Sequence, residues 1–346
     1  MPPAPEPEAP SVRLFASVDL IGSTAFKNQV GSEAAGYRNR VPPWAETFRG
    51  FYWGFARTLH EVPDQHGDSA QSDGERFVLF KSLGDELIFT QTIRRHGDAV
   101  RLSTRFRNAL RAYNSSLGGQ QLGLRVKGTL WIAGFPINNT QIADPRLGDG
   151  LGGFDYLGPS MDAGFRLAKH ASKRRLQVSV DLALLLTVAQ TSLTFFFDGM
   201  EPLRGVLGDR PYPLIWIESD EDDIEQRLQG IDRRHCDYRD LHQFCDNYLA
   251  SCQSPPCWLI KPYLADDPRF QEQPAWHRQI YAEWAKEGAK QSAVTTGSAP
   301  ADTDPVAGTA ITESSITDAV VRFAPSAQRK KRRRNPAART QAEPPG

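Results

Sequence analysis

Apolar segments of two kinds alternate between residues 12 and 218 of this chain of 346 residues. Some segments have the two-residue period of a strand, and the others have the 3.6-residue period of an amphipathic helix. In chain order they predict strand, helix, helix, strand, strand, helix, strand, helix, strand, a short helix, strand and strand. Strands that directly follow one another are typical of a sheet with helices packed on a face, not of a doubly wound parallel sheet. The alternation therefore predicts an α+β domain over residues 12–218.

The segments that flank this domain have a different composition. Residues 1–11 are rich in proline and glutamate and lack the apolar run of a secretory signal, so we expect a disordered leader. Residues 219–288 have mostly helical periodicity and predict a helical C-terminal extension. Residues 289–346 contain few large apolar side chains, which predicts a disordered tail.

The totals of charge and cysteine exclude some classes of protein. The 41 basic and 41 acidic side chains balance, so the overall charge gives no argument for nucleic-acid binding. No apolar run is long enough to cross a bilayer. Four cysteines in a chain of this length do not suggest a disulfide framework. We therefore expect a cytoplasmic protein with reduced thiols.

Histidines and cysteines gather in the predicted extension. A zinc site has four ligands and usually contains a close pair, such as two cysteines separated by two residues. The spacing here is looser, so two interpretations stay open: a structural metal site, or buried reduced cysteines, which we favour. The residues concerned are His235, Cys236, His242, Cys245, Cys252 and Cys257.

Two aspartates lie where predicted strands end. Asp19 ends the strand in "FASVDLIGST", and Asp85 follows a glycine at the tip of the hairpin predicted in "FKSLGDELI". If the two ends are neighbours, their like charges raise one pKa unless a cation neutralises them. Mg²⁺ prefers such oxygen ligands and usually adds phosphate oxygens of a substrate. Each aspartate alone is ordinary turn chemistry, but the two together favour a site for metal and triphosphate. The residues after Asp19 add backbone N–H groups at a helix N-terminus, which suit an anion.

These two stretches together resemble the signature of the class III nucleotidyl cyclases. That family has a ferredoxin-like catalytic core and works as a head-to-tail dimer. The resemblance implies that two divalent cations, Mn²⁺ or Mg²⁺, bind to Asp19, Asp85 and the backbone carbonyl of Leu20. It also implies a base contact from Lys81. The turn that would hold the phosphates consists of Gly22, Ser23 and Thr24.

A later stretch, "FDYLGPSMDAGFRLAKHA", extends the resemblance. Asp155 matches the aspartate that contacts the base, and Arg166 matches the arginine that binds phosphate in the transition state. The motif "LRGV" resembles a late family motif and places Arg204 near the triphosphate, with Arg210 as a weaker competitor. In the family each site is built from both subunits, so the resemblance implies a homodimer with sites at the interface.

One position departs from the usual pattern of the family. The asparagine that orients the ribose is Asp162 here, and an ionised carboxylate only accepts hydrogen bonds. "LGPSMDAGFR" instead resembles the bacterial pyrimidine cyclases of anti-phage defence. This implies conversion of UTP, or else CTP, to 3′,5′-cyclic UMP or CMP plus diphosphate. The product would activate a separate effector protein, and a phage component would be the trigger.

The alternatives to that function stay open at this point. Lys81 and Asp155 suit adenine, which keeps adenylate cyclase, converting ATP to cyclic AMP, as a candidate. A non-catalytic cyclase-like module that senses a nucleotide is another. Large side chains in "FRGFYWGFAR", such as Tyr52 or Trp53, could fill the space of a purine, although core packing explains most of them. The basic run Arg329–Arg334 could bind nucleic acid, an acidic membrane or a phage component, or have no specific partner.

Overall fold

The computed structural model describes residues 11–33, 41–63, 76–119, 123–136, 138–143, 154–189, 191–219, 235–252, 264–266, 282–283 and 286. The chain divides into two units, residues 1–293 and 294–346, and all the described residues belong to the first. The predicted leader up to residue 10, the predicted tail, Cys257 and the basic run Arg329–Arg334 lie outside the described residues.

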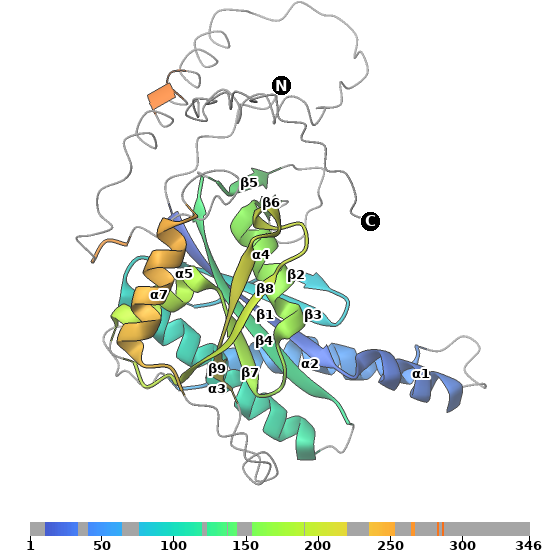
Figure 1. The fold of residues 1–346 in the computed structure, drawn as a ribbon. Helices are drawn as coiled ribbons and strands as arrows, with labels where there is room; N and C mark the ends of the chain where they lie inside the picture. The colour runs from blue at the N-terminus through green and yellow to red at the C-terminus, as the bar shows by residue number, and fades with distance from the viewer. Residues whose placement is uncertain are drawn as a thin grey trace, which may run out of the picture. The chain divides into compact units, whose positions relative to one another are not determined.

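The described residues form strands and helices in the order shown in Figure 1. They are β1 (Ser11–Ile21), α1 (Ser23–Glu33), α2 (Pro43–Glu61), β2 (Val78–Leu83), β3 (Glu86–Ile93), α3 (His96–Gly119), β4 (Arg125–Phe135), β5 (Thr140–Ala143), β6 (Phe154–Leu157), α4 (Pro159–Leu167), β7 (Arg175–Val178), α5 (Val180–Val188), β8 (Phe195–Pro202), β9 (Pro211–Glu218) and α7 (Tyr238–Ala250).

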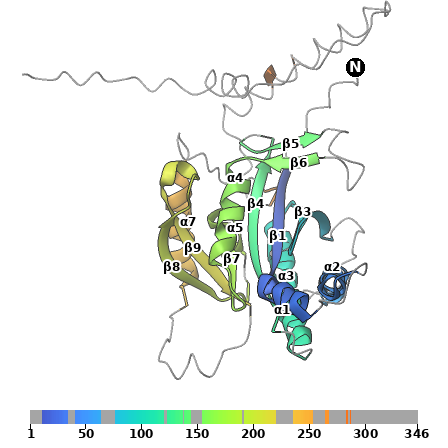
Figure 2. The same ribbon diagram turned by 90° about the vertical axis from the view of Figure 1, so that its right-hand side faces the viewer.

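Seven of the strands form one sheet in the order β2-β3-β1-β4-β7-β9-β8. Neighbouring strands are antiparallel, except for the parallel pair β4 and β7. The first four strands, with α2 and α3 as their connections, form a β-α-β-β-α-β unit in the ferredoxin-like arrangement. The prediction of an α+β fold is therefore confirmed. The separate ribbon of β5 and β6, at the upper end of the sheet in Figure 2, was not predicted.

The two faces of the sheet bury different side chains. Along β1, residues alternate between the faces because successive side chains of a strand point to opposite sides. Leu14, Ala16, Val18 and Leu20 belong to the larger apolar core, which also contains buried side chains of α2, α3 and α5. Phe15 belongs to a smaller core on the other face, where it stacks on the ring of Trp131 and meets the buried Met161 of α4.

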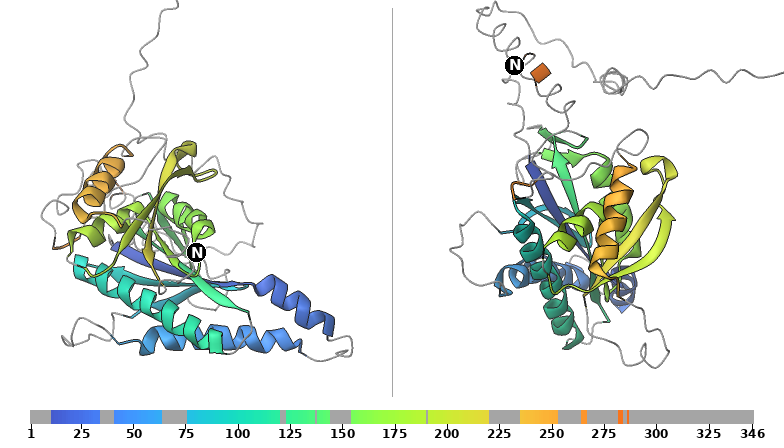
Figure 3. Two further views of the ribbon diagram at one scale, coloured as in Figure 1. Left: turned by 60° about the horizontal axis from the view of Figure 1, so that its bottom comes forward. Right: turned by 60° about the vertical axis from the view of Figure 1, so that its left-hand side comes forward.

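The aromatic segment of α2 serves mainly as core. α2 and α3 lie side by side below the sheet (Figure 3, left), and Phe51 and Phe55 of α2 are buried there against Tyr113 of α3. Trp53 is 76% exposed and points away from this core. Tyr52 donates its hydroxyl hydrogen bond to the carbonyl of Gly84, in the turn between β2 and β3. The helix therefore supports the hairpin that carries Asp85.

Part of the predicted extension packs onto the sheet. α7 lies beside α5, with β8 and β9 on its other side (Figure 3, right), and Leu241 and Leu249 enter the larger core. Asp237 caps this helix by accepting hydrogen bonds from the next backbone N–H groups. Farther on, Asp266 accepts from the backbone N–H of His96 and lies 2.9 Å from its Nδ1, at the start of α3. No helix within the described ranges has the length and apolar character needed to cross a membrane.

Candidate metal and nucleotide site

Three charged residues form a row across three neighbouring strands. Asp19 of β1 lies opposite Glu86 of β3 on one side and opposite Lys127 of β4 on the other. Directly opposed residues of antiparallel strands share a face of the sheet. The row therefore lies on the face away from the larger core. The Nζ of Lys127 is 3.2 Å from Oδ2 of Asp19.

Asp85 lies beside this row, in the turn between β2 and β3. Its carbonyl oxygen accepts a 3.1 Å hydrogen bond from the backbone N–H of Leu20. Its carboxylate accepts a hydrogen bond from the hydroxyl of Ser23. Gly84, just before it, has φ +68°, a left-handed conformation that favours glycine. These contacts join the end of β1 to the hairpin turn and bring Asp19 and Asp85 together.

Glu86 is a third carboxylate of this cluster, and sequence reasoning missed it. Burial raises the pKa of Glu86, and the nearby charges of Asp19 and Asp85 raise it further. The hydrogen bond that its carboxylate accepts from Ser17 and the charge of Lys127 oppose that rise. The signal was present in "GDELI", where Glu86 directly follows Asp85. Its role in the cluster depends on strand register, which the motif alone does not give.

The donor set fits a hard divalent cation. The cluster around Glu86 contains three carboxylates and one ammonium group, so negative charge is in excess. Among the described residues, no three His, Cys, Asp or Glu side chains are arranged to hold a metal by themselves. Mg²⁺ commonly binds through one or two carboxylates and takes its other oxygens from substrate phosphates and water. Asp19 and Asp85 suit that manner of binding.

The turn after β1 is arranged around the same cluster. Gly22 and Thr24 are exposed, whereas Ser23 is buried because its side chain points to Asp85. α1 begins at Ser23, so the first backbone N–H groups of that helix follow the turn. A helix N-terminus offers unpaired N–H donors to an anion. Ser23 therefore has a positioning contact, and Gly22 and Thr24 remain accessible to a ligand.

Lys81 and Asp155 form an ion pair. The Nζ of Lys81 on β2 is 2.7 Å from Oδ2 of Asp155 on β6. The other carboxylate oxygen of Asp155 accepts from the backbone N–H of Tyr156, whose ring is buried in the smaller core. Both charged side chains are about one-third exposed, at 38% and 34%. The structure thus brings together two residues that we expected to contact a base, and it uses the unpredicted β5–β6 ribbon to do so.

Asp162 and Arg166 lie one helical turn apart on α4, and both are exposed. Gly164 lies between them on the packed side of the helix, where a Cβ would overlap the ring of Trp131. Neither charged side chain makes an ion pair or a hydrogen bond within the described part of the chain. The structure therefore does not join them to Asp19 and Asp85 of the same chain.

The two arginines considered for the triphosphate differ in their surroundings. Arg210 donates a 3.0 Å hydrogen bond to the carbonyl of Ser251, and its guanidinium lies 5.1 Å from the ring centre of Tyr248. It therefore holds the end of α7 against the sheet. Arg204 is exposed, in the turn between β8 and β9, and has no side-chain partner among the residues that the structure describes.

The cysteines of the extension are placed as apolar core residues. Cys245 and Cys252 are buried in the larger core, and Cys236 is half-buried. Burial raises the pKa of the Cys245 and Cys236 thiols. A protonated thiol is a poor metal ligand. Two of the three described cysteines therefore lie in the larger core, and Cys236 packs against it.

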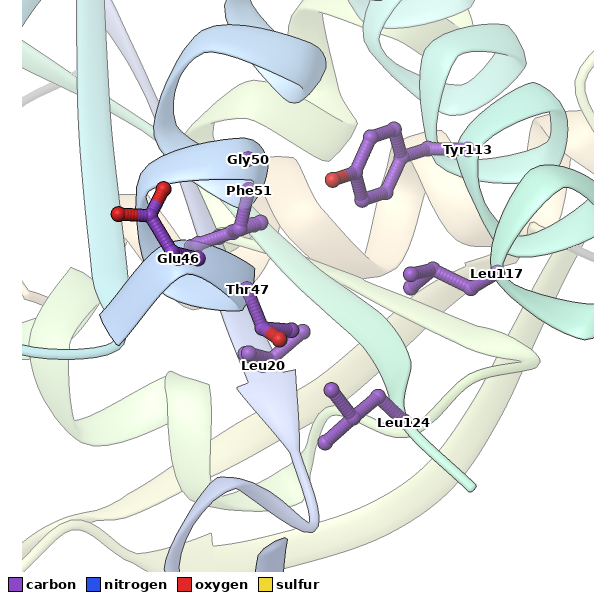
Figure 4. Close-up of a pocket in the computed structure, with 8 residues that line it drawn as sticks. All are labelled: Leu20, Glu46, Thr47, Gly50, Phe51, Tyr113, Leu117 and Leu124. Atoms are coloured by element: carbon purple, nitrogen blue, oxygen red, sulfur yellow. The ribbon is translucent and has the colours of Figure 1, made fainter. Parts of the chain in front are cut away.

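A pocket of about 330 Å³ lies on the opposite side of β1 from the charged row. In Figure 4 the side chains of Leu20, Tyr113, Leu117 and Leu124 surround it, and Glu46 points outward at its rim. Leu20 lines this pocket, while its neighbour Asp19 points to the other face of the sheet. The pocket is therefore separate from the carboxylates.

Comparisons with known proteins give distant similarities. No family model and no curated protein matches the sequence. Among solved structures, the chain is similar to the adenylyl cyclase CyaB from P. aeruginosa, with 12% identity over 62% of this chain and 96% of that one, at TM-score 0.44. It is similar to the guanylyl cyclase Cya2, with 14% identity over 62% and 95% of the two chains, at TM-score 0.41. The guanylate cyclase domain of RhGC from Catenaria anguillulae in complex with GTP has 10% identity over 61% and 98%, at TM-score 0.39.

Proposed function

We propose that this protein is a metal-dependent nucleotidyl cyclase that converts UTP, or else CTP, to the 3′,5′-cyclic monophosphate and diphosphate. The observation that carries the proposal is the joined end of β1 and turn of the β2–β3 hairpin. There Leu20 and Ser23 both bind Asp85. Asp19 lies beside them in the row that it forms with Glu86 and Lys127, which we call the acidic row. A cluster with excess negative charge next to a helix N-terminus suits a triphosphate that arrives with divalent cations.

The reaction is an intramolecular phosphoryl transfer. The ribose 3′-oxygen attacks the α-phosphorus, the bond from that phosphorus to the β-bridging oxygen breaks, and the 3′-hydroxyl loses its proton as diphosphate leaves. Asp19, Asp85 and the Leu20 carbonyl would hold two divalent cations, Mn²⁺ or Mg²⁺. Bound there, the cations would lower the pKa of the 3′-hydroxyl and neutralise the phosphates. The protein itself contributes positioning and charge.

The remaining site residues have distinct roles in this proposal. Arg166 and Arg204 stabilise the negative charge that develops on the α-phosphate and the leaving diphosphate. Asp162 accepts hydrogen bonds from the ribose hydroxyls. Lys81 and Asp155 meet the base, with their ion pair holding each other in place.

A homodimer would complete the site. Arg166 and Asp162 are exposed on α4 and have no side-chain partner within the described part of their own chain. In the proposed dimer, α4 of one subunit faces the acidic row of the other, so each subunit supplies half of two identical sites. The cyclic product would act on a separate effector protein in anti-phage defence. That part of the proposal rests on the resemblance of "LGPSMDAGFR" alone.

One observation favours adenylate cyclase as a second candidate. The 2.7 Å pair of Lys81 and Asp155 presents a donor and an acceptor together, which suits the amino group and ring nitrogen of adenine. The choice between the two functions therefore depends on which nucleoside triphosphate is cyclised.

Product analysis tests the proposal. The purified full chain is incubated with Mn²⁺ and each of the four nucleoside triphosphates separately, and the products are identified by mass spectrometry. We expect cyclic UMP, or else cyclic CMP. Asp85→Asn should abolish the product, whereas Asp240→Asn, at an exposed acid of α7, should not change it. Cyclic AMP alone would contradict the pyrimidine assignment. The absence of a cyclic product from all four triphosphates would contradict the proposal that the protein is a nucleotidyl cyclase.

A further inference from the structure

We infer that Lys127 is the counter-ion of Asp19 in the metal-free protein, and that a divalent cation must displace its ammonium group to bind. This inference rests on the proposed function, since it concerns the same acidic row. It assigns to Lys127 a positioning role that holds the row in place until metal and triphosphate arrive.

Lys127 lies between Asp19 and the end of α4. Its Nζ lies 3.2 Å from Oδ2 of Asp19 and 3.4 Å from the carbonyl oxygen of Ala168, just after α4. These are its two polar contacts among the residues that the structure describes. The side chain is 22% exposed, so most of it lies against the protein. Lys127 thus connects the acidic row with the end of the helix that carries Arg166.

The other two carboxylates of the cluster each accept a hydrogen bond from a serine. Ser17 donates a hydrogen bond to Glu86, and Ser23 donates one to Asp85. Asp19 has the ammonium of Lys127 in place of a hydroxyl, and in the described ranges it has no second cation. It also lies directly opposite Glu86 across the β1–β3 pair. Without Lys127, two opposed carboxylates would repel each other on a half-buried surface, which is costly.

A metal ion bound to Asp19 would need the position next to the carboxylate that the ammonium group of Lys127 occupies. A cation on Asp19 and an ammonium group 3.2 Å from the same carboxylate would repel each other across a short distance of partly desolvated protein. Lys127 therefore weakens cation binding in the absence of nucleotide. Once displaced, its ammonium remains next to the site and can pair with a phosphate oxygen, so triphosphate binding removes the penalty. Metal and nucleotide then bind cooperatively.

Titration with Mn²⁺ in the absence of nucleotide tests this inference. Free Mn²⁺ is measured by electron paramagnetic resonance in solutions of the full chain and its variants. Lys127→Met, which keeps the length of the side chain and removes its charge, should bind Mn²⁺ about tenfold more tightly than the original protein. Lys127→Arg should keep the original affinity. Lys127→Gln serves as a second neutral variant, and circular dichroism shows that each variant is folded.

The matched control is Arg125→Met. Arg125 lies two residues before Lys127 on β4, and its guanidinium donates to the carbonyl of Leu124. Because it removes the same charge from the same strand, it should leave the Mn²⁺ affinity within twofold. An equal gain in Arg125→Met, or no gain in both Lys127→Met and Lys127→Gln, would overturn the inference.

The same titration separates this inference from the proposed function. Mn²⁺ binding that Asp85→Asn abolishes but neutral variants of Lys127 do not strengthen would leave the metal site intact and overturn only the role of Lys127. No Mn²⁺ binding by the original protein or by any Lys127 variant would overturn both. Binding gained only in the neutral Lys127 variants would support the inference most directly.

Discussion

Two carboxylates of this protein, Asp19 and Asp181, are accommodated in opposite ways. Asp181, at the start of α5, is buried, and burial raises its pKa from 3.8 to about 6. Asp19 is half-buried and has an ammonium group beside it. Burial favours the protonated form of Asp181, whereas a cation balances the charge of Asp19. Under the proposed function, a metal ion would take the place of that cation.

The surroundings of the two sites explain the difference. Asp181 accepts hydrogen bonds from the hydroxyl of Ser179 and the backbone N–H of Leu182, and it is enclosed near Tyr212 and Cys245. None of these neighbours can supply a positive charge. Asp19 has neighbours of both signs on adjacent strands. Burial of Asp181 without a cationic partner therefore affects stability, whereas the charged row is where we propose that a metal ion binds.

The largest expected effect is the loss of activity in Asp19→Asn. Removing one carboxylate of the proposed metal site should lower the rate of cyclic nucleotide formation by about a hundredfold or more. The unfolding free energy should change by only about 1 kcal/mol, because a partly exposed ion pair contributes little. Initial rates by mass spectrometry and urea unfolding measure the two quantities. Unchanged activity in a folded Asp19→Asn would remove Asp19 from the site.

Stabilisation by metal is the next effect. A ligand that binds only the folded state at a hundred times its dissociation constant adds about 2.7 kcal/mol to the unfolding free energy. Mn²⁺ with a non-reactive triphosphate analogue should therefore raise the melting temperature of the original protein and of Asp181→Asn equally. Asp85→Asn should not respond. An equal response in Asp85→Asn would place the bound metal elsewhere.

Asp181→Asn should stabilise the protein at pH 7. The pKa of Asp181 is higher in the folded protein than in the unfolded chain, so its contribution to stability is present below about pH 4 and is lost as the pH rises through about 6. Asparagine stays neutral and avoids that loss. The expected gain is about 1–3 kcal/mol at pH 7 and close to zero at pH 4.

Urea unfolding at the two pH values measures this gain, and catalytic activity should not change. A gain of the same size at both pH values would show that titration of Asp181 is not its cause.

The smallest effects compare the two serines. Ser179 donates to Asp181 and Ser17 donates to Glu86. Each alanine variant should lose about 1 kcal/mol at pH 7, where the acceptor is more charged, and less at pH 4. Only Ser17→Ala should also alter Mn²⁺ affinity, because Glu86 belongs to the acidic row. An effect of Ser179→Ala on Mn²⁺ affinity would show that Asp181 and the acidic row are not independent sites.

Much of the fold could be predicted from periodicity. The strands and helices between β1 and β9 follow the expected order, with apolar periods in most of them and a continuous apolar run in α5. The ribbon of β5 and β6 was missed because each strand has only four residues and neither lies in a longer apolar run, as the equally short β7 does before α5. That ribbon carries Asp155. The resemblance implied that Asp155 and Lys81 both contact a base, and their ion pair was not predicted.

The charged row shows a different limit. Asp19 and Asp85 were predicted because each lies at the end of an apolar strand, with Gly22 three residues after Asp19 and Gly84 directly before Asp85. Glu86 and Lys127 were not, because a single charge in a strand has no meaning until its cross-strand partner is known. Register is set by the packing of the whole sheet, so it cannot be read from one segment.

The alternation of β1 also has a consequence for how this protein can vary. Leu14, Val18 and Leu20 face the core, so their replacement should lower the amount of folded protein in a cell. Asp19 faces the other side of the sheet, so its replacement should leave the protein abundant but catalytically inactive. A library of all single substitutions in β1, read out separately for abundance and for product, should therefore show loss of abundance from Leu14 to Val18, where every residue is buried on one face or the other, and loss of product without loss of abundance at Asp19.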